Sequence, residues 1–152
     1  MSTRKDYTVG RGKLAVPKVD SKTLLKFLDE GDVSPYARRM LPIGKWVKVN
    51  GPLQMCRTGI HVTTIGNAQR WLNPQCHVVS VRGDTIRARN KICCREVYIH
   101  PANPYWNGNG FIAYRNAVEF MGARYAGRFL VELLNGRVSD YRLAAFASMK
   151  VR

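Results

Sequence analysis

The sequence predicts an α+β fold, with a mostly antiparallel central sheet over residues 45–100 packed by an N-terminal helix and a C-terminal helical pair. Apolar and polar side chains alternate through Ile60–Thr64, Val79–Arg82 and Ile86–Arg89, as is typical of half-buried strands. Apolar residues within Phe111–Leu134 recur instead with the period of a helix. These two periods, separated along the chain, are the basis for the predicted fold class.

Length and composition indicate a single globular domain. The chain has 152 residues, of which 45% are hydrophobic, enough for a core without disulfides or metal. No apolar run approaches the roughly 18 residues that span a bilayer, and no apolar segment follows the N-terminal charges, so we expect neither a membrane span nor a signal peptide. Four cysteines without paired spacing favour a reducing, intracellular setting. We expect a basic arm over residues 1–20, a helix-plus-sheet core over 21–100 and helices over 111–149.

The first predicted element after the arm is a helix over Lys22–Asp29. Ser21 is a good N-cap, leucines and a phenylalanine form an apolar stripe, and Gly31 is suited to end the helix. Pro35 then favours a second short turn or helix over Pro35–Met40, because proline fits the first helical position.

The sheet region contains several turn signals. Lys45–Val49 alternates like a strand, and Asn50-Gly51 predicts a hairpin that returns through residues 53–55. Asn67–Leu72 predicts a short helix that ends before a proline. Arg82–Asp84 contains a glycine and predicts a second tight turn.

Aromatic residues and glycines mark the C-terminal third. Tyr105 and Trp106 lie in a loop rich in proline, glycine and asparagine, and we expect them to pin this loop to the core, with stacking on a base as the alternative. Gly122 and Gly127 imply a kink or a close contact in the helix after this loop. A final helix begins after Ser139 and forms, with its predecessor, either a packed hairpin, which we favour, or a DNA-reading pair.

The charge of the chain points to a polyanionic partner. Lysines and arginines outnumber acidic residues 25 to 10, a formal net charge of +15. Such a balance favours polyanions through long-range attraction and counterion release, so we expect nucleic acid, or a host complex that carries it, as the partner. A solvated tail and a solvated sheet face are the alternatives for these residues. The positions expected to contact nucleic acid are Arg4, Lys5, Arg11, Lys13 and Lys18 in the arm, Arg38 and Arg39 after it, and Arg82, Arg87 and Arg89 on one strand face.

Cysteines and histidines do not predict a metal or thiol site. No C-x2-C pair is present, and the adjacent Cys93 and Cys94 should point to opposite faces of a strand. His61 and Thr63 share a strand face near Cys56, but no acidic residue is placed to orient the histidine as a base. We therefore expect no bound metal, and structural roles for these side chains.

The segment Cys94–Pro101 resembles the catalytic strand of arginine-type mono-ADP-ribosyltransferases, in which two glutamates one residue apart are followed by aliphatic residues and proline. Glu96 matches the second glutamate, and Cys94 occupies the place of the first. This resemblance implies an enzyme that uses NAD, with Glu96 as the catalytic acid and His61 or Thr63 beside it.

A broader pattern covers about residues 44–99 and consists of Gly44-Lys45-Trp46, Gly51-Pro52-Leu53, Cys56, Gly59-Ile60-His61, Trp71-Leu72, Asn90-Lys91-Ile92 and Glu96. In these residues the chain resembles a small uncharacterised domain of actinobacterial phages and prophages. Relatives often have a cysteine where this chain has Thr63, so no thiol or metal role is implied. The resemblance implies a phage accessory protein in the cytoplasm of a bacterial host. We therefore expect non-catalytic binding of nucleic acid, with the NAD-dependent transferase and a virion-associated structural protein as alternatives.

Overall fold

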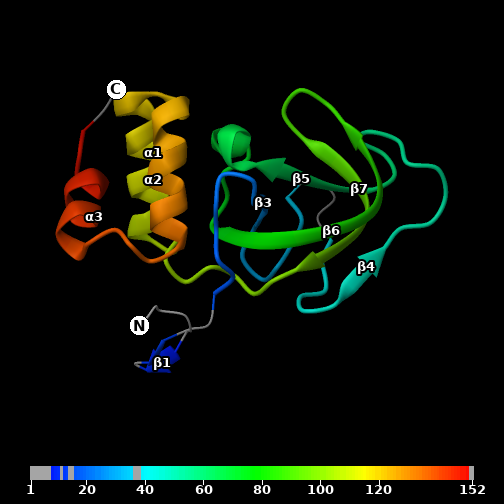
Figure 1. The fold of residues 1–152 in the computed structure, drawn as a ribbon, viewed down its shortest axis with the longest axis horizontal. Helices are drawn as coiled ribbons and strands as arrows, with labels where there is room; N and C mark the ends of the chain where they lie inside the picture. Colours follow the sequence, from blue (N-terminus) through cyan, green and yellow to red (C-terminus); the bar gives the residue numbers. More distant parts are fainter. Residues whose placement is uncertain (1–7, 11, 14–15, 36–38, 151–152) are drawn as a thin grey trace.

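The computed structural model describes residues 8–10, 12–13, 16–35 and 39–150. Within them an antiparallel sheet lies beside a group of helices (Figure 1), which confirms the α+β class. The sheet is not a simple central layer, because it curls into a closed barrel of four strands with a fifth strand attached. A separate ribbon of two short strands, β1 (Thr8–Gly10) and β2 (Gly12–Lys13), lies in the predicted arm.

All strand pairs of the barrel are antiparallel. The hydrogen-bonded order is β4-β7-β5-β3-β6, and a further pairing of β6 with β7 closes the barrel. The strands are β3 (Leu24–Leu28), β4 (Trp46–Lys48), β5 (Ile60–Thr64), β6 (Gln75–Arg87) and β7 (Ile92–Ile99).

The longest strand, β6, closes the barrel by pairing with two different neighbours. Its first part, from Gln75 to Val79, pairs with β3 along the whole length of that strand. From Val79 onward it pairs with β7, as far as the pair Arg87 and Ile92. Strand β6 therefore bonds to both β3 and β7, and this closes the ring of strands β7-β5-β3-β6.

A bulge interrupts the pairing of β6 with β7 between Arg82 and Thr85. Gly83 lies in this bulge with a φ of +81°, a conformation that favours glycine. The neighbouring Asp84 accepts a hydrogen bond of 3.1 Å from the Arg95 guanidinium on β7, which holds the pKa of Asp84 below its usual range. A bulge increases the twist of its strand, which favours a closed sheet.

The predicted tight turn at Arg82–Asp84 is therefore wrong. The glycine there allows a bulge within a continuous strand, and the chain reverses only after the end of β6. The amide of Ala88 donates to the carbonyl of Lys91 at 2.9 Å and forms the turn between β6 and β7.

The predicted helix over Lys22–Asp29 is also wrong, because this segment contains strand β3. Leu25 and Phe27 pack in the core between barrel and helices, whereas Leu28 packs inside the barrel. A strand with both faces buried has no polar alternation, so its sequence resembles an apolar stripe on a helix.

Two other local predictions need correction. The strand that ends before Asn50-Gly51 is β4, and it pairs with β7 rather than with residues 53–55. The short helix before Pro74 is a 3-10 helix, η1 (Ile65–Arg70), and begins two residues earlier than predicted. The predicted element Pro35–Met40 includes residues outside the described part of the chain, and its flanks are joined by a hydrogen bond from Ser34 to the carbonyl of Arg39.

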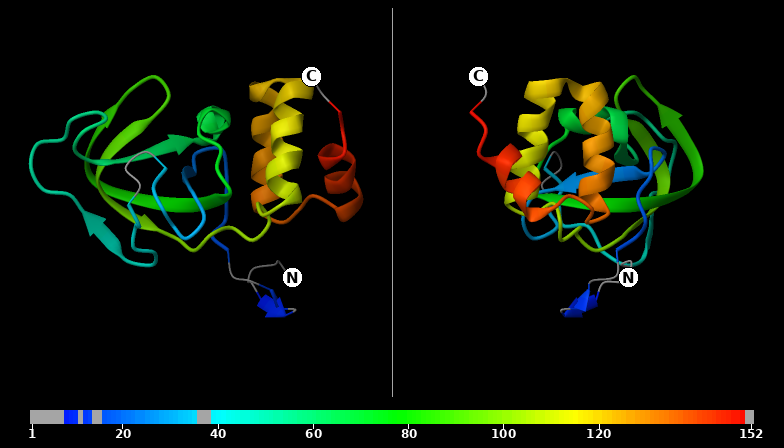
Figure 2. Two further views of the ribbon diagram at one scale, coloured as in Figure 1. Left: turned by 180° about the vertical axis from the view of Figure 1, so that it is seen from behind. Right: turned by 60° about the vertical axis from the view of Figure 1, so that its left-hand side comes forward.

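Three helices, α1 (Asn109–Met121), α2 (Ala123–Leu134) and α3 (Asp140–Ala147), follow the barrel. The predicted single helix is interrupted at Gly122, whose φ is +86°. Figure 2 shows α1 and α2 against one end of the barrel and α3 on their far side. The side-chain amide of Asn116 on α1 donates to the carbonyl of Phe146 on α3 at 2.9 Å. The final helix therefore packs on α1, on the side away from the barrel, and not on the sheet as the predicted helical pair would.

Two apolar cores result from this arrangement, one between the barrel and the helices and one inside the barrel. Trp106 is fully buried in the first core, where its indole N–H donates to the carbonyl of Asn73 at 2.9 Å. This confirms that Trp106 pins its loop to the core. Asn135, at the end of α2, exchanges two hydrogen bonds of 2.8 and 2.9 Å with the backbone of Val19. The segment before β3 is thereby attached to the helices.

We predict that Gly110→Ala destabilises the fold by about 2 kcal/mol, within the range measured for overpacked positions. Gly110 is buried in the first turn of α1, and a Cβ atom there would meet the carbonyl oxygen of Tyr105. The matched control is Gly66→Ala, because a Cβ atom at Gly66 has nothing within 4 Å. Urea unfolding of both variants tests this, and equal stabilities for the two would contradict it.

Candidate functional site

The barrel has a seam where β3 and β5 separate. These strands pair only through Leu24 with Thr64 and Leu25 with Thr63. Beyond that point the ammonium of Lys26 donates a 2.6 Å hydrogen bond to the carbonyl of His61. A lysine side chain thus occupies the position at which the strand ladder would otherwise continue.

A groove with a volume of about 770 Å³ opens at this seam. Residues 25–27 of β3 form one wall, and residues 59–63 form the other. Leu41 and Leu72 add apolar surface from the flanking loops. The volume lies in the range of small-molecule sites, so the groove has room for about one or two nucleotide-sized groups.

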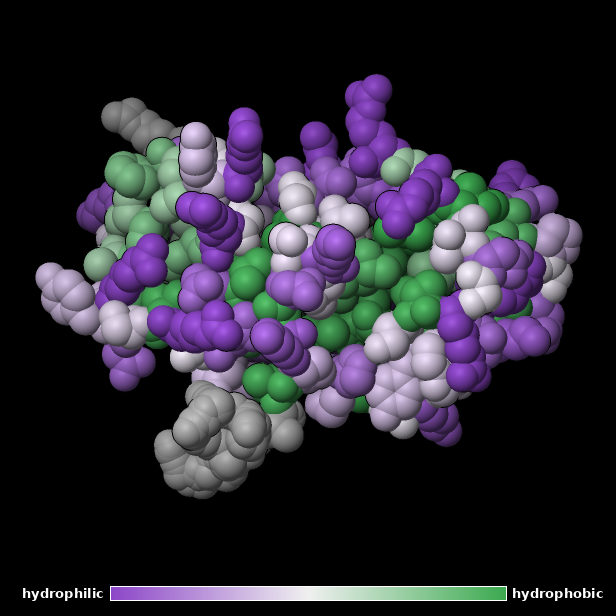
Figure 3. All heavy atoms as spheres, in the orientation of Figure 1, coloured by the Kyte–Doolittle hydropathy of each residue, from purple (hydrophilic) through white to green (hydrophobic). Residues whose placement is uncertain are grey.

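Positive charge dominates the groove. No aspartate or glutamate lines it within the described part of the chain. The acidic side chains that form ion pairs with arginines among the described residues do so elsewhere, at Arg82, Arg95 and Arg137. Figure 3 shows how hydrophilic side chains project around apolar surface on one face of the molecule. The groove is lined by the basic residues Lys26, Arg39, Arg57, Arg70 and Lys91.

The seam alters the protonation of two groups. Burial lowers the pKa of Lys26 to about 8, against a weaker opposing effect of Cys94. Burial also lowers the pKa of His61, and the charges of Lys26 and Lys91 lower it further. His61 is therefore neutral at pH 7, and an anionic ligand would restore part of the lost charge stabilisation at Lys26.

Cys56 and His61 meet in the groove without forming a thiol–imidazole pair. The backbone amide of Cys56 donates to His61 Nε2 at 2.9 Å, so this nitrogen already has a donor. The Lys91 ammonium lies 2.7 Å from Cys56 Sγ. Cys56 also has a φ of +65°, which is uncommon for a residue other than glycine. The histidine thus fixes the backbone of the loop rather than its thiol.

Trp71 supplies an aromatic surface to the groove. Its indole N–H donates to the carbonyl of Asn90 at 2.9 Å, which fixes the ring. The Lys91 ammonium lies 5.5 Å from the ring centroid. Cation and ring therefore lie side by side at the groove, an arrangement suited to a ligand that carries both phosphate and a base.

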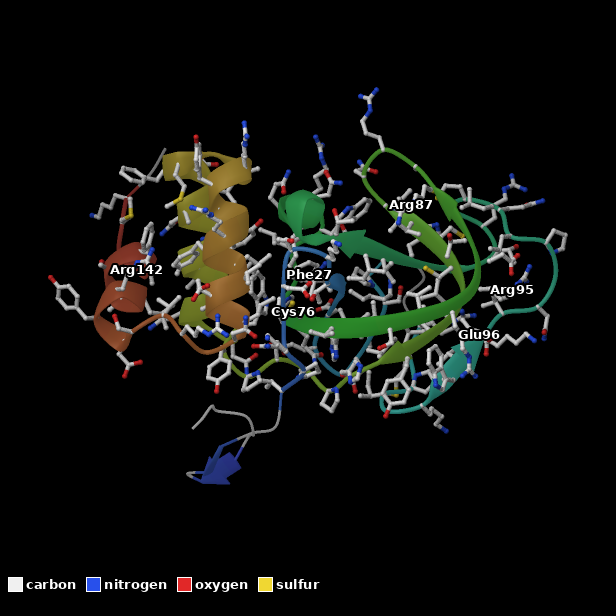
Figure 4. The ribbon with its side chains drawn as sticks, in the orientation of Figure 1. Phe27, Cys76, Arg87, Arg95, Glu96 and Arg142 are labelled. Atoms are coloured by element: carbon white, nitrogen blue, oxygen red, sulfur yellow. The ribbon has the colours of Figure 1, made fainter. Side chains whose placement is uncertain are left out.

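Three of the predicted site residues, Arg39, His61 and Thr63, line the groove. Glu96 does not line it. Its carboxylate accepts a 3.2 Å hydrogen bond from Arg82, whose guanidinium also lies 3.9 Å from the ring centroid of Trp46. In Figure 4, Glu96 lies toward the end of the barrel that is farthest from the helices. The structure thus separates Glu96 from His61 and Thr63, which the transferase alternative would place together.

The three arginines predicted on one strand face are divided by the bulge. Arg82 lies opposite Glu96 on the outside of the barrel, whereas Arg87 lies opposite Ile92, which packs inside it. Directly opposite residues point to the same face, so Arg82 and Arg87 do not share one. Arg87 and Arg89 remain exposed near the turn between β6 and β7, and Lys18 is exposed before β3. The side chains of Arg4, Lys5, Arg11, Lys13 and Arg38 lie outside the described residues.

Four groove residues were not predicted as site residues from the sequence: Lys26, Arg57, Arg70 and Lys91. Lys26 had a local signal, because it is the only charged residue in the apolar run Leu24–Leu28. Of the other three, Arg57 and Lys91 lie in turns and Arg70 ends η1, and no spacing along the chain relates them. In the part of the chain that is described, no three histidine, cysteine or acidic side chains are grouped to hold a metal ion.

Comparisons with protein families, curated proteins and solved structures find no match to this chain. The resemblances to a phage domain and to mono-ADP-ribosyltransferases therefore stay predictions. None of the helices in the described ranges combines the length and apolar character that a bilayer span requires.

The lowered pKa of Lys26 predicts a pH-dependent contribution to stability. The folded chain binds this proton more weakly than the unfolded chain, so the contribution of Lys26 is least favourable below pH 8 and rises toward pH 10.5. The unfolding free energy of the native protein relative to Lys26→Met should therefore increase by about 3 kcal/mol over this interval. Urea titrations at several pH values measure it.

Exposed Lys22, mutated to methionine, is the control for the loss of one positive charge. The contradicting result is a difference in unfolding free energy between the native protein and Lys26→Met that is constant from pH 8 to 10.5. That result would show that Lys26 has the pKa of an ordinary lysine.

Proposed function

We propose that this protein binds nucleic acid in single-stranded form, with the groove between β3 and β5 as the contact site. The observation that carries the proposal is the lining of the groove, which has five lysines and arginines and no carboxylate within the described chain. A groove of this kind attracts anions. Its protein walls have a low dielectric constant, which concentrates the electric field of the lysines and arginines within the groove.

The shape of the groove favours a single strand. Non-sequence-specific single-strand binders combine a positive groove that follows the phosphates with aromatic side chains on which bases stack. Here the exposed Arg57 and Arg70 supply the charge, and Trp71 supplies the ring. A double helix keeps its bases paired and stacked, so it offers no base to enter a groove of about 770 Å³.

The remaining basic surface has a supporting role in this proposal. The net charge of +15 accelerates encounter with any polyanion, and the exposed Arg87 and Arg89 extend the positive potential beyond the groove. The phage resemblance supports a bacterial cytoplasm as the setting and free nucleic acid or a nucleic-acid-bearing host complex as the partner. A virion-associated protein that only neutralises packaged DNA would not need an acid-free groove. No contact of Glu96 favours the transferase alternative.

Three triple variants with the same loss of charge test where nucleic acid binds. The groove variant replaces Arg57, Arg70 and Lys91 with glutamine. The strand variant replaces Arg82, Arg87 and Arg89, and the helix variant replaces Arg115, Arg124 and Arg128, all exposed. Affinity for a fluorescent oligothymidylate is measured for each protein between 50 and 300 mM salt, a range in which ionic contacts are resolved.

The groove variant should flatten the log–log salt dependence by about two units, because each lost phosphate contact on a single strand contributes about 0.7. The helix variant should leave this slope nearly unchanged. Equal slopes for all three variants would show that only net charge matters, and a loss confined to the strand variant would move the site to the β6–β7 turn.

A further inference from the structure

Lys26 differs from the other cations of the groove in its position. It lies on β3 between Leu25 and Phe27, which pack toward the helices, so its own side chain points to the opposite face. There its ammonium makes a 2.6 Å hydrogen bond to the carbonyl of His61. The amine is therefore held at the bottom of the seam, whereas the exposed Arg57 and Arg70 lie at the solvent side of the groove.

This position also makes the amine chemically reactive. Burial lowers the pKa of Lys26 to about 8, so about a tenth of the amine is uncharged and nucleophilic at pH 7 and about half at pH 8. The titratable groups that interact with it are Cys94, His61 and His77, and burial keeps both histidines neutral at pH 7. No carboxylate of the described groove lining competes for the amine.

The surroundings define the class of compound that would reach the amine. Arginines and Lys91 around the groove select a ligand with phosphate groups, and the apolar seam admits a group without a bulky base. A sugar that has lost its base is small, is flanked by phosphates in a strand, and opens to an aldehyde at C1. An aldehyde condenses readily with an uncharged amine. The other functional groups of a nucleic acid do not react readily with amines.

We propose that Lys26 captures the open-chain aldehyde of a phosphorylated sugar as an imine, with an abasic site in a bound single strand as the source. The Lys26 nitrogen attacks C1, a C–N bond forms, and the carbonyl oxygen leaves as water with the two amine protons. No oxidant or reductant is consumed. The choice of an abasic strand rests on the proposed nucleic-acid function, whereas the reactivity of the amine does not.

Borohydride trapping on the full chain tests the proposal. The protein is incubated with a single-stranded oligonucleotide that carries one abasic site, with the intact oligonucleotide, or with ribose 5-phosphate, each in the presence of sodium cyanoborohydride. Reduction converts the imine to a stable secondary amine, which peptide mass spectrometry assigns to a residue. We expect an adduct on Lys26 with the abasic strand and none with the intact strand.

Lys26→Arg is the decisive variant, because arginine retains a cation that can donate to the His61 carbonyl but does not form a stable imine. It should reduce trapping at least about tenfold. The matched exchange Lys22→Arg, at an exposed lysine outside the groove lining, should leave trapping within about twofold. Mapping on the native protein needs no variant, so the proposal stays testable if Lys26→Arg fails to fold.

The possible outcomes separate this proposal from the proposed function. Binding of the intact strand with no adduct on Lys26 from either aldehyde overturns the capture proposal and leaves the binding function. An adduct with ribose 5-phosphate alone, with no strand binding, supports a reactive Lys26 but overturns both the abasic source and the binding function. Adducts spread over many lysines, with Lys26 not preferred, overturn the proposal.

Discussion

Closure of the barrel by β6 is the constraint on which the other features depend. This strand pairs with the whole length of β3 and then, from Val79, with β7, and a bulge at Gly83 within the β6–β7 pairing increases its twist. Because β6 already anchors β3, β3 does not depend on a full ladder with β5. The two strands pair through two residues and then separate, and the groove is the result.

The seam has a local energetic cost that explains its chemistry. A backbone carbonyl left without a ladder partner in a protein wall needs a donor, and Lys26 supplies one to His61 from the neighbouring strand. The donor is a charged group that burial destabilises, and this lowers its pKa. One hydrogen bond therefore both completes the sheet and creates a partly desolvated amine next to open space. An apolar side chain would leave the carbonyl of His61 unsatisfied.

The sequence predicted the elements that have one buried face and a pattern confined to neighbouring residues. Strand β5, with alternating side chains, and α3, with its Ser139 cap, appear where the pattern placed them. Strand β3 was mistaken for a helix because both of its faces are buried, and a run of apolar residues has the same composition in either structure. The bulge at Gly83 was mistaken for a turn because glycine permits a positive φ in both.

Much less of the groove was predictable, for a physical reason. Arg57, Arg70 and Lys91 come from separate segments that only the closed barrel brings together, and charged residues on loops are common in any basic protein. His61 and Thr63 were singled out from their strand, but with a different partner, Glu96, which the register places beside Arg82 instead. Lys26 was the informative residue, since a lysine within an apolar run needs a specific reason to be there.

The paired hydrogen bonds between Asn135 and the backbone of Val19 have a consequence for folding during synthesis. The two residues are 116 positions apart in the chain. The side-chain amide of Asn135 donates to the carbonyl of Val19 and accepts from its N–H, as one residue of an antiparallel strand pair does with the other. At about 5–20 residues per second, a ribosome needs on the order of ten seconds to produce the second partner after the first. The segment before β3 thus leaves the ribosome well before its anchor exists, and it docks only when the end of α2 has formed. The attachment of the basic arm is therefore among the last steps in the assembly of this protein.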